Sequence, residues 1–138
     1  MSGLVLDCSV AVTWCFEDEA DADTDAVLDL VQEEGATVPG LFALEVANVL
    51  VHAERRGRLT AGAVAARVAL IESLPIAVDQ DTAAKGLRET LALARQERLT
   101  TYDAAYLELA CRLNVPLATR DGDLRRSAHK LGVPLLPP

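Results

Sequence analysis

The chain has 138 residues, of which 51% are hydrophobic and 25% are charged, a composition typical of one globular domain with a sizeable core. Its net charge of −8 argues against a protein that coats nucleic acid through a basic surface. The two longest apolar runs, 40–53 and 64–78, are interrupted by charged side chains before they reach the roughly 20 residues of a membrane span. Residues 1–7 lack the basic start and the long apolar middle of a signal peptide, so we expect a single cytoplasmic domain over residues 1–138 without a membrane segment.

The charges are distributed unevenly along the chain. Residues 1–50 contain eleven acidic side chains and no Lys or Arg, so this part carries a charge of −11 and residues 51–138 carry +3. A local basic surface can therefore lie beside an acidic one. The three cysteines, Cys8, Cys15 and Cys111, lack C-x-x-C spacing, so we expect no disulfide or zinc site and interpret all three as buried apolar side chains.

Short apolar runs alternate with longer helical patterns along the chain. Strands are predicted at residues 4–7, 36–40, 75–79, 116–119 and 133–137. Helices are predicted at residues 9–16, 17–35, 41–57, 59–74, 81–99, 100–115 and 123–132. Ser9 lies near the predicted N-cap of the first helix, and the acids of the second form a solvent-exposed face. This alternation predicts an α/β fold with three α/β/α layers around a small central parallel sheet.

Two aspartates directly follow predicted strands. Asp7 ends the segment "LVLD", and Asp121 follows "PLAT" across a turn. Because ligands bind at the carboxyl ends of the strands in open parallel sheets, we expect both side chains at the same edge. Asp7 can instead cap the following helix, although Ser9 competes for that role. Asp123 is predicted to be the N-cap of a helix that begins at Leu124.

Glu45 lies in a run, 41–53, in which nearly every position is apolar. This pattern predicts a helix that is buried on most of its circumference, with Glu45, Asn48 and His52 on one face. A carboxylate on a buried helix requires an ion pair or a metal ion, because its desolvation is otherwise costly. We therefore interpret Glu45 either as the partner of a later arginine or as a metal ligand.

Asp103 lies three residues after Thr100 and fits a capping box, but the same position also directs it towards the edge of the sheet. Four separate segments thus bring acids to one place: Asp7, Glu45, Asp103 and Asp121. Without cations these carboxylates would repel one another. Carboxylate oxygens in this number suit Mg²⁺ or Mn²⁺, and a carboxylate-held metal pair is an established device for cleaving phosphodiesters.

Four motifs in this order resemble those of the PIN-domain ribonucleases and, among these, the VapC-type toxins of toxin/antitoxin pairs. "LVLDCSV" resembles the opening D-x-S motif, "LEVANVL" the E-x-x-N helix, "TTYDAAYLELA" the Y-D-A-x-Y helix and "LATRDGDL" the T-x-D-x-D-L turn. The resemblance covers essentially the whole chain and implies a PIN-like fold. Cys8 departs from the small or hydroxyl residue that is more usual after the first Asp, and we expect its side chain to point away from the site.

The resemblance also implies roles for individual residues. Catalysis and ligation of Mg²⁺ or Mn²⁺ are implied for Asp7, Glu45, Asp103 and Asp121, with Asp123 as an accessory ligand. Orientation of these carboxylates, or of their waters, is implied for Ser9, Asn48 and Thr119.

The activity that the resemblance implies is metal-dependent hydrolysis of RNA, often at a tRNA or ribosomal RNA loop, which leaves a 5′-phosphate and a 3′-hydroxyl. It further implies a homodimer that is silenced by a cognate antitoxin. Candidate contacts to RNA phosphates are Arg120 and Arg98, followed by Arg125 and Arg126, each weighed against a solvated surface charge. Trp14 or Tyr102 can stack a base, and the alternative for both is a place in the core.

Other functions are less consistent with the sequence. An aspartyl-phosphate phosphatase requires D-x-D after the first strand, where this chain has Asp7, Cys8 and Ser9. A receiver domain requires a lysine after the last strand, and "VPLLPP" contains none. The remaining alternative is a catalytically silent PIN-like module that binds a protein or RNA.

Overall fold

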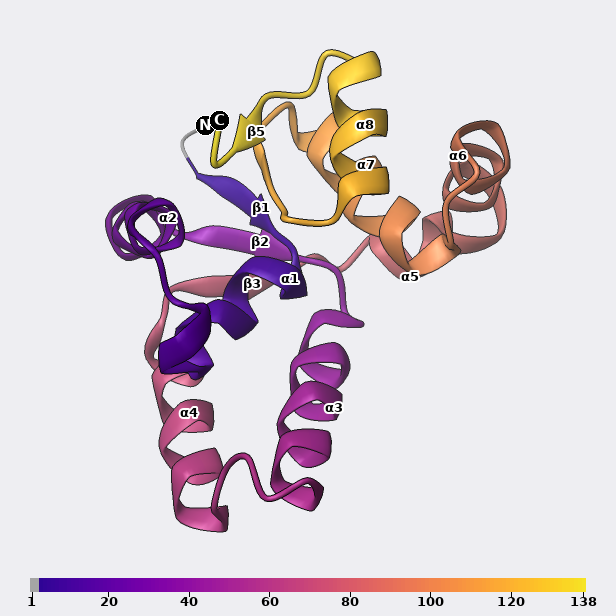
Figure 1. Cartoon of the computed structure of the whole chain (residues 1–138). Coiled ribbons are helices and arrows are strands. Elements are labelled where there is room, and N and C mark those ends of the chain that lie inside the picture. Colours follow the sequence, from indigo (N-terminus) through magenta and orange to yellow (C-terminus); the bar gives the residue numbers. More distant parts are fainter. Residues whose placement is uncertain (1–2) are drawn as a thin grey trace.

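The computed structural model describes residues 3–138 and has a central sheet of five parallel strands in the order β3-β2-β1-β4-β5 (Figure 1). The strands are β1 (Leu4–Leu6), β2 (Ala36–Val38), β3 (Ile76–Val78), β4 (Leu117–Ala118) and β5 (Leu135–Leu136). All five strands were predicted from the sequence and are confirmed. β1 is buried along its whole length, as expected for the central strand of a sheet that is covered on both faces.

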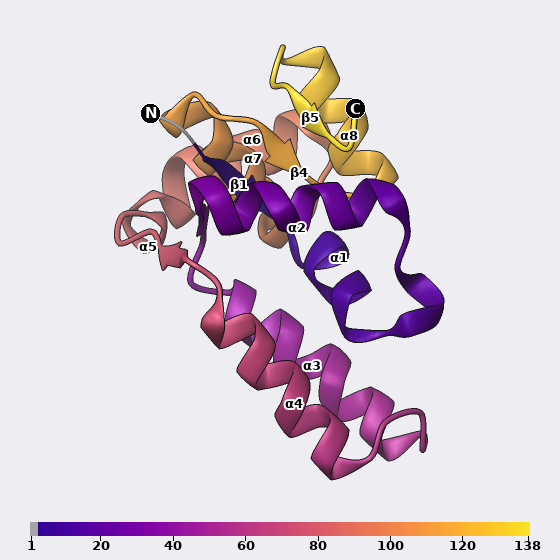
Figure 2. The same cartoon turned by 90° about the vertical axis from the view of Figure 1, so that its left-hand side faces the viewer.

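Eight α-helices accompany the sheet within the described residues. They are α1 (Cys8–Ala11), α2 (Ala22–Glu34), α3 (Phe42–Arg55), α4 (Ala61–Ser73), α5 (Thr82–Lys85), α6 (Leu91–Glu97), α7 (Thr101–Leu113) and α8 (Gly122–Lys130). Two 3₁₀ segments, η1 (Val12–Cys15) and η2 (Glu17–Glu19), join α1 to α2, and a π-helical segment, η3 (Gly86–Thr90), joins α5 to α6. Figure 2 shows α2 in front of the sheet and α6 and α7 behind it, which confirms the three-layer α/β/α fold.

Local signals in the sequence explain where several helices begin and end. The side chain of Asp21 accepts a hydrogen bond from the amide of Thr24, and the hydroxyl of Thr24 bonds the amide of Asp21, so α2 starts with a complete capping box. Thr60 caps α4 in the same way through the amide of Ala63. Gly35 ends α2 with a φ of 81°, a conformation that side chains other than glycine rarely adopt.

The register of the sheet places the ends of β1 and β4 side by side. Val5 pairs with Leu117, and the amide of Asp7 donates to the carbonyl oxygen of Ala118 at 2.9 Å. Asp7 and the residues after Ala118 therefore leave the sheet together at its carboxyl edge. The parallel pairing, and not the proximity of these segments in the sequence, brings them into contact.

The prediction that the helix around Glu45 is buried on most of its circumference is wrong. In α3 only Phe42, Val46, Leu50 and Ala53 are buried, and Leu44 is 76% exposed. α4 contributes no buried residue. The reason is that α3 and α4 form a hairpin that projects away from the sheet, so each helix can pack on one side only (Figures 1 and 2).

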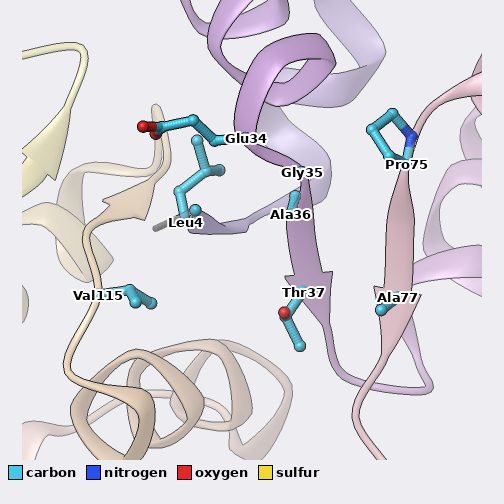
Figure 3. A pocket seen from close by; sticks show the side chains of 9 residues that line it. Leu4, Glu34, Gly35, Ala36, Thr37, Pro75, Ala77 and Val115 are labelled. Carbon is cyan, nitrogen blue, oxygen red and sulfur yellow. The ribbon is translucent and has the colours of Figure 1, made fainter. Parts of the chain in front are cut away.

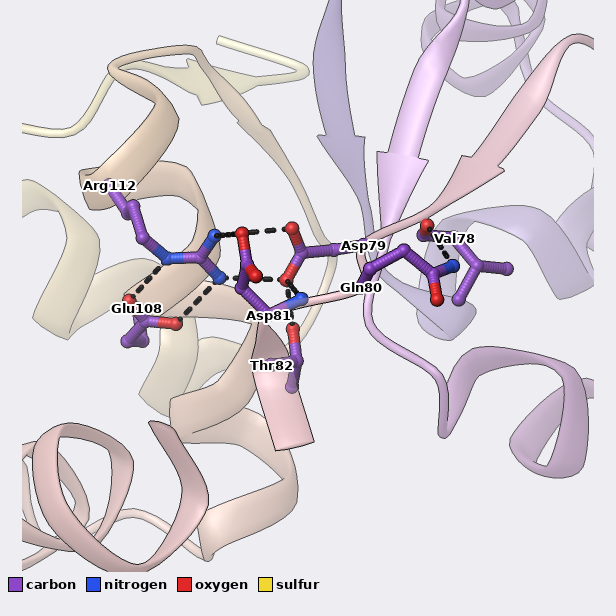
Figure 4. Close-up of polar contacts among 7 residues, drawn as sticks. All are labelled: Val78, Asp79, Gln80, Asp81, Thr82, Glu108 and Arg112. Atoms are coloured by element: carbon purple, nitrogen blue, oxygen red, sulfur yellow. Dashed lines mark hydrogen bonds and ion pairs between the residues drawn. The ribbon is translucent and has the colours of Figure 1, made fainter. Parts of the chain in front are cut away.

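A charged network connects α7 to the carboxyl end of β3 (Figure 4). The guanidinium of Arg112 donates to both carboxylate oxygens of Asp79, at 3.1 and 2.8 Å, and also to Glu108. The hydroxyl of Thr82 donates to the same Asp79 carboxylate at 2.6 Å. Arg112 holds the pKa of Asp79 down at about 2, so this carboxyl stays ionised. The network fastens the helix that carries Asp103 to an edge strand of the sheet.

Two expectations about cysteine and aromatic residues need correction. Cys8 and Cys15 are buried as predicted, but Cys111 is exposed, because it lies on the outer side of α7. Tyr102 is 64% exposed and is therefore not a core residue. Trp14 is half-buried, and its indole N–H donates to the carbonyl oxygen of Thr24 at 2.9 Å, which gives it a structural role. No helix in residues 3–138 has both the length and the apolar character to cross a bilayer.

Candidate active site

Asp7 is the most deeply buried acid of the predicted cluster, with 5% of its surface exposed. It occupies the N-cap position of α1, but its side chain does not cap that helix. Its Oδ2 atom instead accepts hydrogen bonds from the hydroxyls of Ser9, at 2.6 Å, and Thr119, at 2.7 Å. Ser9 therefore contacts the carboxylate, and the expectation that it lies at the N-cap of the first helix is wrong, because Asp7 occupies that position. Burial raises the pKa of Asp7, and these two hydrogen bonds oppose that rise.

The turn after β4 is built around the hydroxyls of Ser9 and Thr119. The amide of Arg120 donates to Ser9 Oγ at 2.8 Å, and the amide of Asp121 donates to Thr119 Oγ1 at 3.1 Å. The two hydroxyls lie 3.3 Å apart. The same pair of hydroxyls thus contacts the Asp7 carboxylate and the backbone that presents Asp121.

Asp121, and not Asp123, caps the following helix. The Oδ1 atom of Asp121 accepts a hydrogen bond from the amide of Leu124 at 2.9 Å, and α8 begins at Gly122. The prediction of Asp123 as the N-cap is wrong by two residues, because α8 already begins at Gly122 and includes Asp123 in its first turn. Asp123 is exposed in the first turn of α8 and pairs with Arg126 at 2.7 Å.

Glu45 is half-buried in the first turn of α3 and is held by a tyrosine. The hydroxyl of Tyr106, on α7, donates to Glu45 Oε1 at 2.5 Å. Burial raises the pKa of Glu45, and the nearby Asp7 raises it further. The alternative of a salt bridge from Glu45 to a later arginine has no support in residues 3–138, where the hydroxyl of Tyr106 is the partner that the structure gives.

Tyr106 is a site residue that the sequence reasoning did not identify. Its side chain is fully buried between α7 and α3, and it lies three residues after Asp103, so both project from α7 towards the acids. The signal was the second tyrosine of "YDAAY", a hydroxyl on an otherwise apolar helix face. A phenol buried in this way requires an acceptor, and Glu45 provides one.

Asp103 lies in the first turn of α7, where the side chain of Thr100 caps the helix by accepting from the amide of Asp103 at 3.1 Å. Half of the predicted capping box is therefore present. Burial raises the pKa of Asp103 to about 6, and repulsion from Asp121, Asp7 and Glu45 contributes to this rise. Asp103 therefore lies near the other three acids of the predicted cluster.

The four carboxylates form an acidic centre, which we define as Asp7, Glu45, Asp103 and Asp121. Within the described residues, the side chains as placed do not form a group of three or more His, Cys, Asp or Glu ligands around one metal position. Burial and the neighbouring acids raise the pKa of Asp7, Glu45 and Asp103, while the carboxylates of Asp7, Glu45 and Asp121 are each oriented by separate hydrogen-bonding partners. Rotation of at least one carboxylate is therefore needed before three of them can share a ligand.

Asn48 is not brought into the acidic centre. It is exposed on α3, one turn after Glu45, and lines a hollow together with Phe16, His52 and Arg58. Arg58 covers this hollow from one side, because its guanidinium stacks 3.9 Å from the ring centroid of Phe16. The helical spacing correctly placed Asn48 beside Glu45, but the outward projection of α3 turns its side chain towards this hollow.

The two arginines predicted to contact phosphates, Arg120 and Arg98, each line a hollow. Arg120 directly precedes Asp121 and lines a hollow with Asp21 and Asp23. Its positive charge contributes to the lowered pKa of Asp21. Arg98, at the left-handed C-cap of α6, lines a second hollow of about 590 Å³ together with Asp123. Arg98 has no ion-pair partner among residues 3–138. The two arginines considered as phosphate contacts thus line separate hollows, one beside Asp21 and one beside Asp123.

A further hollow lies at the opposite edge of the sheet (Figure 3). It is lined by small and apolar residues around the amino ends of β1 and β2, and Glu34 is its one ionisable side chain. A hollow of about 250 Å³ without convergent polar groups offers little to a charged substrate. The carboxyl edge therefore remains the candidate site.

The chain belongs to the PIN domain family, since the family model matches residues 4–130. PIN domains are generally nucleases, a class of hydrolases. A comparison with solved structures finds similarity to PAE2754 from Pyrobaculum aerophilum, with a TM-score of 0.70 and 25% sequence identity over 92% of this chain and 86% of that chain. A search of curated proteins returned no match.

The raised pKa of Asp103 predicts a pH-dependent effect of the substitution Asp103→Asn. The folded pKa of about 6 exceeds the ordinary value of 3.8, so the folded state binds more protons and the wild type loses stability as the pH rises between these values. In EDTA at about pH 8, we expect the variant to gain roughly 1–2 kcal/mol in urea unfolding, a value reduced for partial exposure, and to gain little below about pH 4.

The matched control is Asp29→Asn on the exposed face of α2, which leaves the unfolding midpoint unchanged at both pH values. Equal midpoints for Asp103→Asn and the wild type at the higher pH would show that the acids do not repel one another in the folded state.

Proposed function

We propose that this protein is a metal-dependent endoribonuclease that hydrolyses RNA phosphodiesters. The observation that carries the proposal is the acidic centre, in which four carboxylates from four segments meet at the carboxyl edge of the sheet, and burial together with the neighbouring acids raises the pKa of Asp7, Glu45 and Asp103. Neighbouring acids of this kind are costly for stability, and they concentrate at functional sites. Membership of a family of nucleases supports the same activity.

The donor set suits Mg²⁺ or Mn²⁺, because it consists of carboxylate oxygens with no nitrogen or sulfur ligand among them. Asp7, Glu45, Asp103 and Asp121 would hold the ion, with Asp123 as an accessory ligand from the first turn of α8. When bound, the ion neutralises the acids and lowers the pKa of a coordinated water, which makes that water a nucleophile at neutral pH.

The side chains around the acids supply orientation. Ser9 and Thr119 donate to Asp7 and leave its Oδ1 atom free to bind, since both hydroxyls contact Oδ2. Tyr106 occupies Oε1 of Glu45 and leaves Oε2. Asp121 uses Oδ1 in capping α8 and keeps Oδ2. Asp7, Glu45 and Asp121 therefore each retain one oxygen for a ligand while the other oxygen sets the direction of the carboxylate.

The placement of charge supports a single-stranded segment of RNA as the substrate, such as a tRNA or ribosomal RNA loop. Arg98 and Arg120 can bind phosphates on either side of the acidic centre, which itself repels a polyanion. Tyr102, exposed beside Asp103, offers a ring on which an unpaired base can stack. A paired strand has no free base face to offer to this ring.

The proposal includes the role of toxin in a type II toxin/antitoxin pair. Exposed apolar side chains on the α3–α4 hairpin, Leu44, Val51 and Val68, support a homodimer or another protein partner. A cognate antitoxin that places a basic residue in the acidic centre would neutralise it. Light scattering on the purified protein measures its mass directly, and a monomer at micromolar concentration would contradict the homodimer.

Metal-dependent cleavage is the first prediction of this proposal. The purified protein is expected to cut structured RNAs with Mg²⁺ or Mn²⁺ and to stop when EDTA is added. Asp7→Asn and Asp103→Asn should each lower kcat/KM by at least about a hundredfold, because the acids act as a unit. Gel analysis of end-labelled RNA measures the rates.

Asp29→Asn is the control for that assay and should cut like the wild type. If a folded wild type leaves a broad set of structured RNAs intact and calorimetry detects no Mn²⁺ binding, the protein is instead a catalytically silent PIN-like module.

Separate removal of the two flanking arginines tests the proposed path of the RNA. In the inactive background Asp103→Asn, Arg98→Ala and Arg120→Ala are each expected to weaken RNA binding and to reduce the slope of log K against log salt concentration by about 1. Arg55→Ala, exposed at the end of α3, should leave this slope unchanged. If all three variants keep the slope of the parent Asp103→Asn protein, the RNA phosphates bind elsewhere.

Growth arrest tests the role as a toxin. Induced expression of the wild type in a bacterial host is expected to stop growth and to produce discrete RNA fragments, while Asp103→Asn at the same protein level permits growth. If the cells continue to grow although their lysate contains soluble wild-type protein with nuclease activity, the protein is a nuclease but not a toxin.

A further inference from the structure

Arg125 contacts the backbone behind the acidic centre and has no carboxylate partner among the described residues. It lies in the second turn of α8 and is half-buried. Its Nη1 atom donates to the carbonyl oxygen of Thr119, and its Nη2 atom donates to the carbonyl oxygen of Pro137, both at 2.9 Å. This placement differs from the sequence-based interpretation of Arg125 as a phosphate contact, because two of its donors are already used inside the protein.

We propose that Arg125 is a positioning residue that sets the geometry of Asp7 and Asp121 through Thr119. The inference rests on the nuclease function proposed above and assigns to Arg125 no contact with substrate or metal. It also connects the segment after β5 to the acidic centre, since Pro137 lies immediately beyond that strand.

Thr119 is the residue through which Arg125 acts. Its side chain is fully buried, donates to the Asp7 carboxylate at 2.7 Å and accepts from the amide of Asp121 at 3.1 Å. Its own amide donates to the carbonyl oxygen of Leu136 at 3.0 Å. With Arg125 on its carbonyl oxygen, Thr119 is held on three sides, so its hydroxyl can take up one orientation towards both acids.

The chemistry of arginine suits this role. A guanidinium has donors in a fixed planar fork, so one side chain can hold two carbonyl groups from different segments at a constant separation. Hydrogen bonds from a charged donor are stronger than those between neutral groups. Without Arg125, the carbonyl groups of Thr119 and Pro137 are no longer held together, and the turn that carries Asp121 can shift relative to Asp7.

The test compares Arg125→Ala with Arg58→Ala. Arg58 also joins separate segments, through Asp18 and Glu19, but it contacts none of the acids of the centre. Hydrogen exchange of the Arg120 and Asp121 amides reports directly on the turn, because these amides bond to Ser9 and Thr119. We expect exchange about tenfold faster in Arg125→Ala and unchanged in Arg58→Ala.

Kinetics and metal binding provide the second measurement. Arg125→Ala should lower kcat by about tenfold with KM within about twofold of the wild type, and should weaken Mn²⁺ binding in calorimetry by a similar factor. A variant that raises KM, leaves kcat unchanged and reduces the salt dependence of RNA binding would identify Arg125 as a phosphate contact and overturn the proposal. If Arg125→Ala does not fold, Arg125→Lys is measured, for which we expect smaller changes in the same direction.

The exchange measurement separates this inference from the proposed function. Unchanged exchange at both amides overturns the role of Arg125, whether or not the protein cuts RNA. Faster exchange in a protein whose wild type neither cuts RNA nor binds Mn²⁺ supports the positioning of the turn and contradicts the nuclease function.

Discussion

The main constraint on the candidate site is the electrostatic repulsion among four carboxylates, which the fold brings together at one edge of its sheet. Parallel strands end at the same edge, so the residues after β1 and β4 meet there, and the first turns of α3 and α7 add two more acids. Burial makes each charge harder to sustain, as the pKa of about 6 for Asp103 shows. The hydroxyls of Ser9, Thr119 and Tyr106 respond to this constraint, since each one stabilises an ionised neighbour without adding charge.

Two arginines join the segments that carry the acids to other parts of the chain. On one side Arg112 fastens α7 to the end of β3, and on the other Arg125 fastens the turn after β4 to the segment beyond β5. Both arginines contact fixed groups of the protein, whereas the guanidinium groups of Arg98 and Arg120 form no hydrogen bond within residues 3–138. The fold thus uses arginine in two ways, as an internal fastener and as a surface charge, and only the contacts distinguish them.

A difference in packing separates the sheet region from the α3–α4 hairpin. The sheet and the helices that cover it enclose the core, which includes Tyr106 and nearly all the fully buried side chains. The hairpin packs on one side and leaves Leu44 and Val51 exposed. Glu45 lies where the hairpin joins the sheet, so a partner that binds the hairpin would lie close to the acidic centre. This proximity provides a physical route by which a protein partner can influence the site.

The sequence by itself predicted the five strands in chain order, the parallel sheet and the candidate acids, because hydrophobic periodicity and residues at strand ends are local signals. It predicted one helix over residues 81–99, where the structure has α5, η3 and α6. It did not determine that Asp121 rather than Asp123 caps α8, that Tyr106 holds Glu45, or that α3 is exposed on most of its surface. Those features depend on where distant segments approach one another. An apolar helix has the same sequence pattern whether it projects from the fold or lies inside it. Only the tertiary structure could show that Arg125 binds backbone carbonyl groups, since its two partners lie in separate segments.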